Sequence, residues 1–144
     1  MHRFLDATAG EYMTRTVKTV RRDTTMRELQ RLFDEVDFNA FPVRENDDIV
    51  GLVTKFDFLK CFAFTPSRMV PSYDELLSRR VAEVMTPEFI YVDAGTKLAR
   101  VLQLMVDHRI KSIPVLDARQ RLAGIIARED IMRALANGRE QVKT

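Results

Sequence analysis

The sequence predicts an α/β protein made of two β-α-β-β-α repeats that pack with pseudo-twofold symmetry. The first observation is a recurring tetrapeptide: Glu-Tyr-Met-Thr at residues 11–14 returns as Glu-Val-Met-Thr at 83–86, a shift of 72. The second is Phe-Pro-Val at residues 41–43, which returns as Ile-Pro-Val at 113–115 with the same shift. Landmarks held in one order over so many positions indicate an internal duplication.

The third observation is an apolar run that ends in a polar corner and opens a helix. Residues 51–57 read Gly-Leu-Val-Thr-Lys-Phe-Asp, and residues 124–130 read Gly-Ile-Ile-Ala-Arg-Glu-Asp, a shift of 73. The extra residue in the shift is expected in a turn. The repeat places domain 1 at residues 8–64, a linker at 65–80 and domain 2 at 81–138. One copy of this size buries too little surface to be more than marginally stable alone, so we expect each copy to cover the other's sheet.

The first repeat begins with a short strand at 17–20, which is rich in β-branched residues. Thr25 and Glu28 have the spacing of a capping box and predict a helix start. The apolar residues that follow have helical spacing and predict one buried face: Met26, Leu29, Leu32, Phe33 and Val36. The remaining elements expected in this repeat are a strand at 41–44, a turn at 45–48, a strand at 49–53 and a helix at 55–64.

Pro66 and Pro71 mark the linker, and a short helical turn is expected at 73–78. The elements expected in the second repeat are strands at 89–92, 112–116 and 122–126, a turn at 117–120, and helices at 97–108 and 128–136. Asn137-Gly138 is expected to end the last helix, because a Gly often terminates a helix. Residues 139–144 are expected as a frayed tail.

Composition excludes several classes of function. The 144 residues carry 23 Lys+Arg and 21 Asp+Glu, interspersed along the chain, which argues against a nucleic-acid interface. Cys61 is the only cysteine, so an intrachain disulfide is impossible and a cytoplasmic setting fits best. No apolar run reaches the roughly 18 residues of a membrane span, and no signal-peptide core is present. No catalytic set or metal-binding motif stands out, so a small enzyme is the least favoured interpretation.

The polar corner at residues 54–57 has two interpretations. Thr54 and Asp57 place a hydroxyl and a carboxylate at a helix N-terminus, where unpaired N–H groups favour a phosphorylated, hydroxyl-bearing molecule. The same Thr-x-x-Asp spacing is close to a capping box, in which the two residues only stabilise the helix start.

These features resemble a tandem pair of CBS domains, the module named after cystathionine β-synthase. The resemblance rests on the two Met-Thr pairs, on Asp-His-Arg-Ile at 107–110 with Ser-Ile-Pro-Val at 112–115, and on both corners. It implies a regulatory module, not an enzyme, that binds AMP, ADP, ATP or S-adenosylmethionine in clefts between the repeats. It also implies a homodimer and a regulated enzyme or transporter as partner, with no nucleic acid, membrane, metal or resident cofactor.

In one cleft the resemblance implies that Asp57 holds the ribose hydroxyls, and that Thr54 meets phosphate with Lys55 as a nearby cation. The residues implied from the second repeat are Thr86, Phe89, Ile90, Lys111, Ser112 and Ile113.

A second, weaker cleft is implied around Arg128 and Asp130. Facing them the resemblance places Thr14, Val17, Asn39, Ala40 and Phe41. Ala127 stands where the family has Thr or Ser, so this corner lacks a hydroxyl contact worth about 0.5–1.5 kcal/mol. The alternative to a ligand sensor is a dimerising adaptor with degenerate clefts.

Overall fold

The computed structural model describes residues 3–63 and 72–142, with side chains described as far as residue 138. Two compact units divide the chain: unit 1 combines Met1–Val17 with Ile90–Thr144, and unit 2 is Lys18–Phe89. Each holds a small antiparallel sheet with helices packed on it, so the predicted mixture of helices and strands is confirmed.

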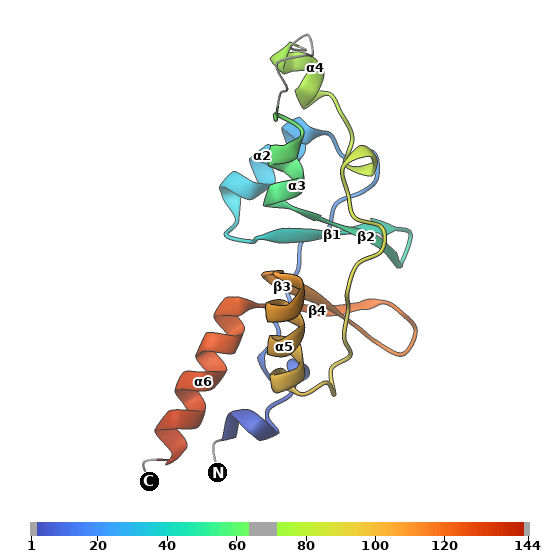
Figure 1. Cartoon of the computed structure of the whole chain (residues 1–144). Helices are drawn as coiled ribbons and strands as arrows, with labels where there is room; N and C mark the ends of the chain where they lie inside the picture. The colour runs from blue at the N-terminus through green and yellow to red at the C-terminus, as the bar shows by residue number, and fades with distance from the viewer. Residues whose placement is uncertain (1–2, 64–71, 143–144) are drawn as a thin grey trace. The chain divides into compact units, whose positions relative to one another are not determined.

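Unit 2 is a β-hairpin covered by helices (Figure 1). Its elements are α2 (Met26–Glu35), β1 (Ala40–Glu45), β2 (Asp48–Thr54), α3 (Lys55–Lys60), α4 (Tyr73–Leu77) and the 3-10 turn η2 (Val81–Glu83). Strand β1 pairs with β2 in antiparallel register from Ala40 opposite Thr54 to Glu45 opposite Asp48. Helix α2 begins at Thr25, whose hydroxyl accepts the Glu28 N–H at 3.3 Å, as the capping spacing predicts. Its apolar face joins both strands in one core, with Met26, Leu29, Phe41, Val43 and Val53 fully buried.

Unit 1 has the same hairpin-and-helix plan, again with two short helical elements beside it. Its elements are the 3-10 turn η1 (Arg3–Asp6), α1 (Ala9–Tyr12), α5 (Leu98–His108), β3 (Ser112–Leu116), β4 (Leu122–Ala127) and α6 (Arg128–Val142). Strand β3 pairs with β4 from Ser112 opposite Ala127 to Leu116 opposite Leu122. The core joins α5, α6 and both strands, and its buried residues include Leu98, Val101, Ile113, Ile126 and Ile131.

The expected first strands at 17–20 and 89–92 are corrected to single-residue bridges. Val20 forms an isolated parallel bridge with Val43, and Val92 forms one with Val115. Extending the first bridge by one step would need a backbone N–H at residue 42, and Pro42 has none. Pro114 prevents extension of the second bridge for the same reason. The prolines of the Phe-Pro-Val and Ile-Pro-Val motifs therefore limit the strands expected at 17–20 and 89–92.

The two Met-Thr segments explain why the compact units differ from the sequence repeats. Thr14 exchanges two backbone hydrogen bonds with Ile125 on β4, at 2.9 and 3.0 Å. Thr86 exchanges two with Leu52 on β2, at 3.0 and 2.8 Å. Each segment therefore pairs with a strand of the other repeat. The boundaries 8–64 and 81–138 describe the repeats in the sequence, whereas the compact units contain exchanged N-terminal segments.

Two helix ends differ from expectation, and part of the predicted linker lies outside the described residues. Helix α3 ends at Lys60 rather than 64, and α6 runs through Asn137 and Gly138 to Val142. The Asn137 amide donates to the Tyr12 hydroxyl at 3.2 Å, so a tertiary contact supports the helix where the sequence suggested a stop. Of the predicted linker at 65–80, residues 65–71 lie outside the described residues. Among the helices of the described residues, none has the length and apolar character to cross a bilayer.

Candidate functional site

The corner between β2 and α3 of unit 2 is built by two residues that cap each other. The Thr54 N–H donates to Asp57 Oδ2 at 3.0 Å, and the Asp57 N–H donates to the Thr54 hydroxyl oxygen at 3.0 Å. The capping-box interpretation is therefore confirmed. Asp57 is only 5% exposed, which is unusual for a carboxylate and requires partners for both oxygens.

The second oxygen of Asp57 has a cationic partner on the next turn of the helix. Lys60 Nζ lies 3.2 Å from Asp57 Oδ1. Each carboxylate oxygen has two lone pairs, so both retain capacity to accept a hydroxyl hydrogen bond. The Thr54 hydroxyl hydrogen has no acceptor among the described residues, and exposed Lys55 has no ion pair among them either. The corner therefore has acceptors suited to ribose hydroxyls and donors suited to a phosphate group.

The corresponding corner of unit 1 is held differently. The Ala127 N–H donates to Asp130 Oδ2 at 2.8 Å, but Ala127 offers no hydroxyl to the Asp130 N–H. Arg133 Nη1 donates to Asp130 Oδ1 at 2.9 Å, and Arg133 Nη2 donates to the Tyr12 carbonyl at 3.1 Å. The Arg133 guanidinium also lies 5.9 Å from the Tyr12 ring centroid. Asp130 is 3% exposed. Arg133 therefore links the buried Asp130 carboxylate to Tyr12 of the same unit.

In unit 2 the structure brings Thr86 to the Thr54 corner. The Thr86 backbone pairs with Leu52, two residues before Thr54 on the same strand, and its side chain is exposed. Half-buried Phe89 belongs to the same unit. The Lys55 N–H donates to the Asn39 carbonyl at 3.0 Å, so the residues before Pro42 also border this corner.

In unit 1 Thr14 has the place that Thr86 has in unit 2, because it pairs with Ile125 two residues before Ala127. The Arg128 N–H donates to the Lys111 carbonyl at 3.1 Å, and Ser112 is the register partner of Ala127. Val17 and Ile90 also belong to unit 1. The crosswise assignment of Lys111, Ser112 and Ile113 to the Thr54 corner, and of Asn39, Ala40 and Phe41 to the Asp130 corner, stays a prediction.

Two of the expected site residues have their side chains in the cores. Phe41 is fully buried in unit 2, with its ring centroid 4.8 Å from that of Phe33. Ile113 is fully buried among the core residues of unit 1. Neither side chain is therefore available to a ligand.

Sequence reasoning missed the cations that hold the two carboxylates. Lys60 and Arg133 each follow their Asp by three residues, a spacing that places both side chains on one helix face. The two positions differ by 73, the shift of the corners themselves, so the repeat contained the signal. Among the described residues, no group of His, Cys, Asp and Glu side chains is arranged to hold a metal ion.

The duplicated hairpin units with capped Asp corners define a tandem-repeat module, and its family follows from sequence comparison. A family model described as CBS domain matches residues 9–63 and 81–137. The chain belongs to the CBS domain family. Protein MJ1225 of Methanocaldococcus jannaschii is 28% identical over 130 residues, covering 88% of this chain and 46% of that protein. Its crystal structure has a TM-score of 0.81 at 25% identity, over 88% of this chain and 47% of that one.

Two plant proteins are also similar. The chloroplastic CBS domain-containing protein CBSX1 of Arabidopsis thaliana is 30% identical over 149 residues, covering 88% of this chain and 63% of that protein. The crystal structure of CBSX2 in complex with AMP has a TM-score of 0.76 at 26% identity, over 96% of this chain and 99% of that one. The chain thus spans 46% and 63% of the lengths of MJ1225 and CBSX1.

Matches also occur inside larger proteins. The chain is 27% identical to the inosine-5'-monophosphate dehydrogenase of M. jannaschii, covering 87% of this chain and 23% of that protein. It is 27% identical to the magnesium transporter MgtE of Thermus thermophilus, covering 92% of this chain and 28% of that protein. CBS pairs of this kind therefore occur as parts of enzymes and transporters.

Proposed function

We propose that the chain is a regulatory module that binds an adenine nucleotide at the Thr54 corner and signals its presence to a partner. The observation that carries the proposal is the similarity to CBSX2, whose structure contains AMP and aligns with 96% of this chain. AMP is accordingly the first ligand proposed, with ADP, ATP and S-adenosylmethionine as the compounds to compare with it.

The chemistry of the Thr54 corner supports this ligand class. The Asp57 carboxylate is already oriented by the Thr54 N–H and by Lys60, so it can accept ribose hydroxyls without reorganising. The Thr54 hydroxyl and the Lys55 ammonium are donors suited to a phosphate. Exposed Thr86 adds a second hydroxyl from the neighbouring segment of unit 2.

The Asp130 corner is proposed as the weaker of the two sites. Ala127 supplies no hydroxyl, and the Arg133 guanidinium already holds one oxygen of Asp130. Arg128 is the remaining cation, but its Nε donates to Glu129 at 3.3 Å. A phosphate at this corner would therefore compete with an existing ion pair.

The proposal includes further roles for residues of the Thr54 site. Phe89 and Ile90 are proposed to lie against the base, and the residues proposed beside the ligand are Lys111, Ser112 and Ile113. For the weaker site the same holds for the roles of Thr14, Val17, Asn39, Ala40 and Phe41.

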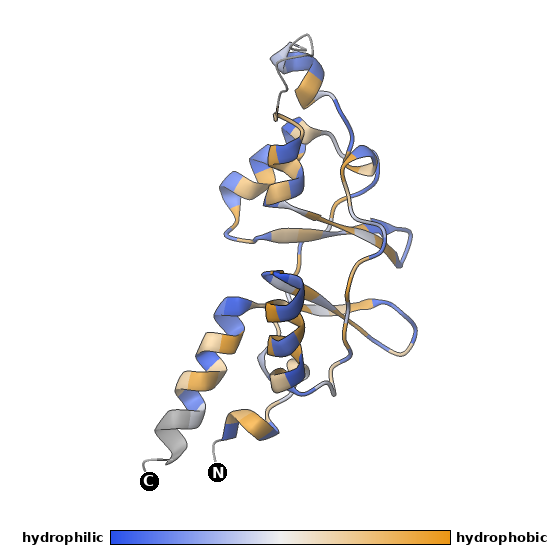
Figure 2. Ribbon diagram, viewed as in Figure 1, coloured by the Kyte–Doolittle hydropathy of each residue, from blue (hydrophilic) through white to orange (hydrophobic). Residues whose placement is uncertain are grey.

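A homodimer is the proposed assembly, because both units expose large apolar side chains on helices. Phe56 and Leu59 on α3 are exposed, as are Met132 and Leu135 on α6, and Figure 2 shows apolar stretches along these helices. Exposed apolar groups of this kind often mark contact surfaces.

The assembly is tested by light scattering on the wild type and on the variants Met132→Asp and Leu59→Asp. The wild type should be a dimer, and at least one of the two substitutions should convert it to a monomer. A wild-type monomer at all concentrations would contradict the assembly.

The ligand proposal is tested by thermal unfolding with AMP, ADP, ATP and S-adenosylmethionine. A ligand that binds the folded state raises Tm progressively with its concentration. Asp57→Asn keeps the size of the side chain and should weaken AMP binding by about tenfold or more, because a charged acceptor is lost. The matched variant Asp130→Asn should change AMP binding much less.

The adaptor interpretation predicts the opposite result from the same experiment. In that case Thr54 and Asp57 serve only as a cap, so neither AMP nor the other three compounds shifts the Tm of the wild type. Asp57→Asn would then lower Tm equally with and without ligand.

A further inference from the structure

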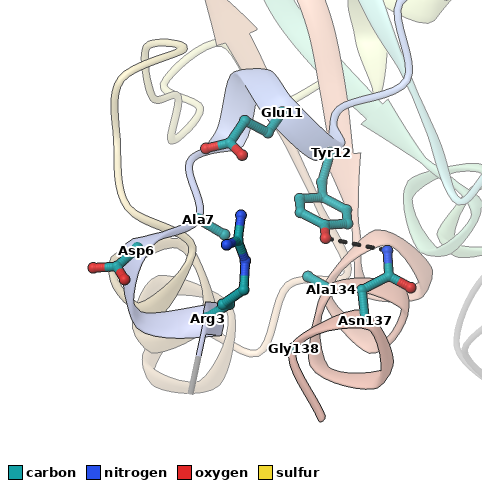
Figure 3. Close-up of a pocket in the computed structure, with 8 residues that line it drawn as sticks. All are labelled: Arg3, Asp6, Ala7, Glu11, Tyr12, Ala134, Asn137 and Gly138. Carbon is teal, nitrogen blue, oxygen red and sulfur yellow. Dashed lines mark hydrogen bonds between the residues drawn. The ribbon is translucent and has the colours of Figure 1, made fainter. Parts of the chain in front are cut away.

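A pocket of about 220 Å³ lies in unit 1 (Figure 3). Its wall is formed by the turn η1, the short helix α1 and the helix α6. Small residues make the hollow: Ala7 and Ala134 are buried at its edge, and Gly138 contributes no side chain. Pockets for drug-sized ligands span about 300–1,000 Å³, so this one fits a smaller metabolite.

Two polar groups at the pocket are donors. The Arg3 guanidinium points into the space between η1 and Tyr12 (Figure 3), and it has no hydrogen bond or ion pair with any described residue. The Tyr12 hydroxyl accepts the Asn137 amide at 3.2 Å, which leaves its own hydrogen available. A planar guanidinium and a nearby hydroxyl together match a carboxylate, which accepts a bidentate pair and a third bond.

The acceptor that faces the pocket is Glu11. Glu11 Oε1 accepts the Thr8 N–H and the Thr8 hydroxyl, both at 3.1 Å, so Glu11 Oε2 remains available. Asn137 donates to Tyr12 through its amide nitrogen, and its oxygen is turned away from Arg3 and Glu11 (Figure 3). The side chain of Asp6 is turned away from the pocket, and the Glu11 carboxylate faces the Arg3 guanidinium (Figure 3).

We propose that this pocket binds a free α-amino acid. Its carboxylate would pair with Arg3 and the Tyr12 hydroxyl, and its ammonium group with Glu11. Both charges of the zwitterion then find an opposite charge within one small cavity. The small residues Ala7, Ala134 and Gly138 leave room for a modest side chain.

Tyr12 also connects the pocket with the Asp130 corner. Its carbonyl accepts the Arg133 side chain that pairs with Asp130, while its hydroxyl lines the pocket. An amino acid that orders Tyr12 therefore acts on a residue in direct contact with this corner.

The proposal is tested by isothermal titration calorimetry of the full chain with each of the twenty L-α-amino acids. For any amino acid that binds, the corresponding primary amine and 2-oxo acid are titrated in parallel. The amino acid should bind at least about tenfold more tightly than either analogue, because each analogue leaves one charged group of the pocket unpaired. AMP is left out, so the result is independent of the nucleotide proposal.

Two variants locate the site. Arg3→Ala should weaken amino-acid binding by about tenfold or more, since a charge-assisted pair is lost. Asn137→Leu should also abolish it by placing an apolar group in the pocket, with circular dichroism used to verify the helix. Arg100→Ala, an exposed arginine on α5 of the same unit, should leave binding unchanged. The proposal is overturned if no amino acid binds, or if binding persists in Arg3→Ala or is lost equally in Arg100→Ala.

Discussion

Met85 lies directly over Gly51: a Cβ placed on Gly51 would be 2.9 Å from Met85 Sδ and 3.1 Å from the Thr86 carbonyl oxygen. The same relationship holds in unit 1, where a Cβ on Gly124 would be 2.7 Å from Met13 Sδ and 2.8 Å from the Thr14 carbonyl oxygen. The glycine that opens each corner motif thus makes room for the Met-Thr segment that crosses it. Without this close approach the reciprocal backbone pairing of the segment with the strand could not form.

Alanine at either glycine should therefore destabilise the fold. We expect Gly51→Ala to lower the free energy of unfolding by about 1–3 kcal/mol, as overpacking generally does. Gly124→Ala should cost more, because its Cβ would lie 2.8 Å from a backbone oxygen, that of Thr14, against 3.1 Å from the Thr86 oxygen at Gly51. Gly95→Ala is the control, since its Cβ would meet only Asp93 Oδ1 at 3.5 Å. Urea unfolding measures all three, and equal effects at Gly95 and Gly124 would contradict the explanation.

The difference between the two caps predicts opposite effects of exchanging their residues. Thr54→Ala removes the hydroxyl that accepts the Asp57 N–H and should cost about 0.5–2 kcal/mol of stability. Ala127→Thr supplies the missing hydroxyl next to the Asp130 N–H and should stabilise by up to a similar amount. The measurement is the free energy of unfolding. Destabilisation by Ala127→Thr would show that unit 1 has no room for the second cap.

The two cations beside the buried carboxylates should differ in importance. Arg133 contacts Asp130, the Tyr12 carbonyl and the Tyr12 ring, so Arg133→Ala should cost about 1.5–3 kcal/mol, as expected for hydrogen bonds to charged groups. Lys60 forms an ion pair with Asp57 and lies 5.6 Å from the centroid of exposed Phe56. The Lys60 and Arg133 side chains are equally exposed, at 56%, so the expected difference rests on the Tyr12 contacts that Lys60 lacks. Lys60→Ala should cost less than about 1 kcal/mol, as for other exposed ion pairs. Equal losses in chemical denaturation would mean that the contact with Tyr12 adds nothing.

Asp117 lies in the turn between β3 and β4, and its hydrogen bonds predict that the stability of the fold depends on pH. The backbone N–H groups of Arg121 and Arg119 donate to Asp117 Oδ1 at 3.0 and 2.8 Å, and they lower the pKa of this carboxyl from its ordinary value. A carboxyl with a lowered pKa in the folded state stabilises the fold above its unfolded-state pKa. That contribution disappears as the pH falls through the lowered value.

The consequence is measurable with Asp117→Ala. The variant should be less stable than wild type near neutral pH, and the difference should shrink when both are unfolded at a pH below the folded-state pKa. Carbon NMR of the side-chain carboxyl should give a midpoint below the ordinary Asp value of about 3.9. A midpoint at or above that value would contradict the prediction.

Much of the local structure could be predicted from residue patterns. The capping box at Thr25, the apolar face of α2 and the reciprocal cap between Thr54 and Asp57 all follow from spacing over one helical turn. The first strands were overpredicted, because β-rich composition at 17–20 does not reveal that Pro42 lacks the N–H a longer ladder needs. Helix α6 was predicted too short, since Asn137 and Gly138 resemble a helix stop until Tyr12 is known to bind Asn137.

The sequence by itself determined the duplication, because the same motifs recur at shifts of 72 and 73 residues. It also determined the caps and the two Asp corners, because these depend on residues within about one helical turn of one another. Only the tertiary structure decided which segment pairs with which strand: Thr14 with β4 and Thr86 with β2, across the repeats. It also decided that Lys60 and Arg133 hold the carboxylates and that a polar pocket lies between η1, α1 and α6. Such contacts form between residues far apart in the chain, and their energy depends on packing that no local spacing encodes.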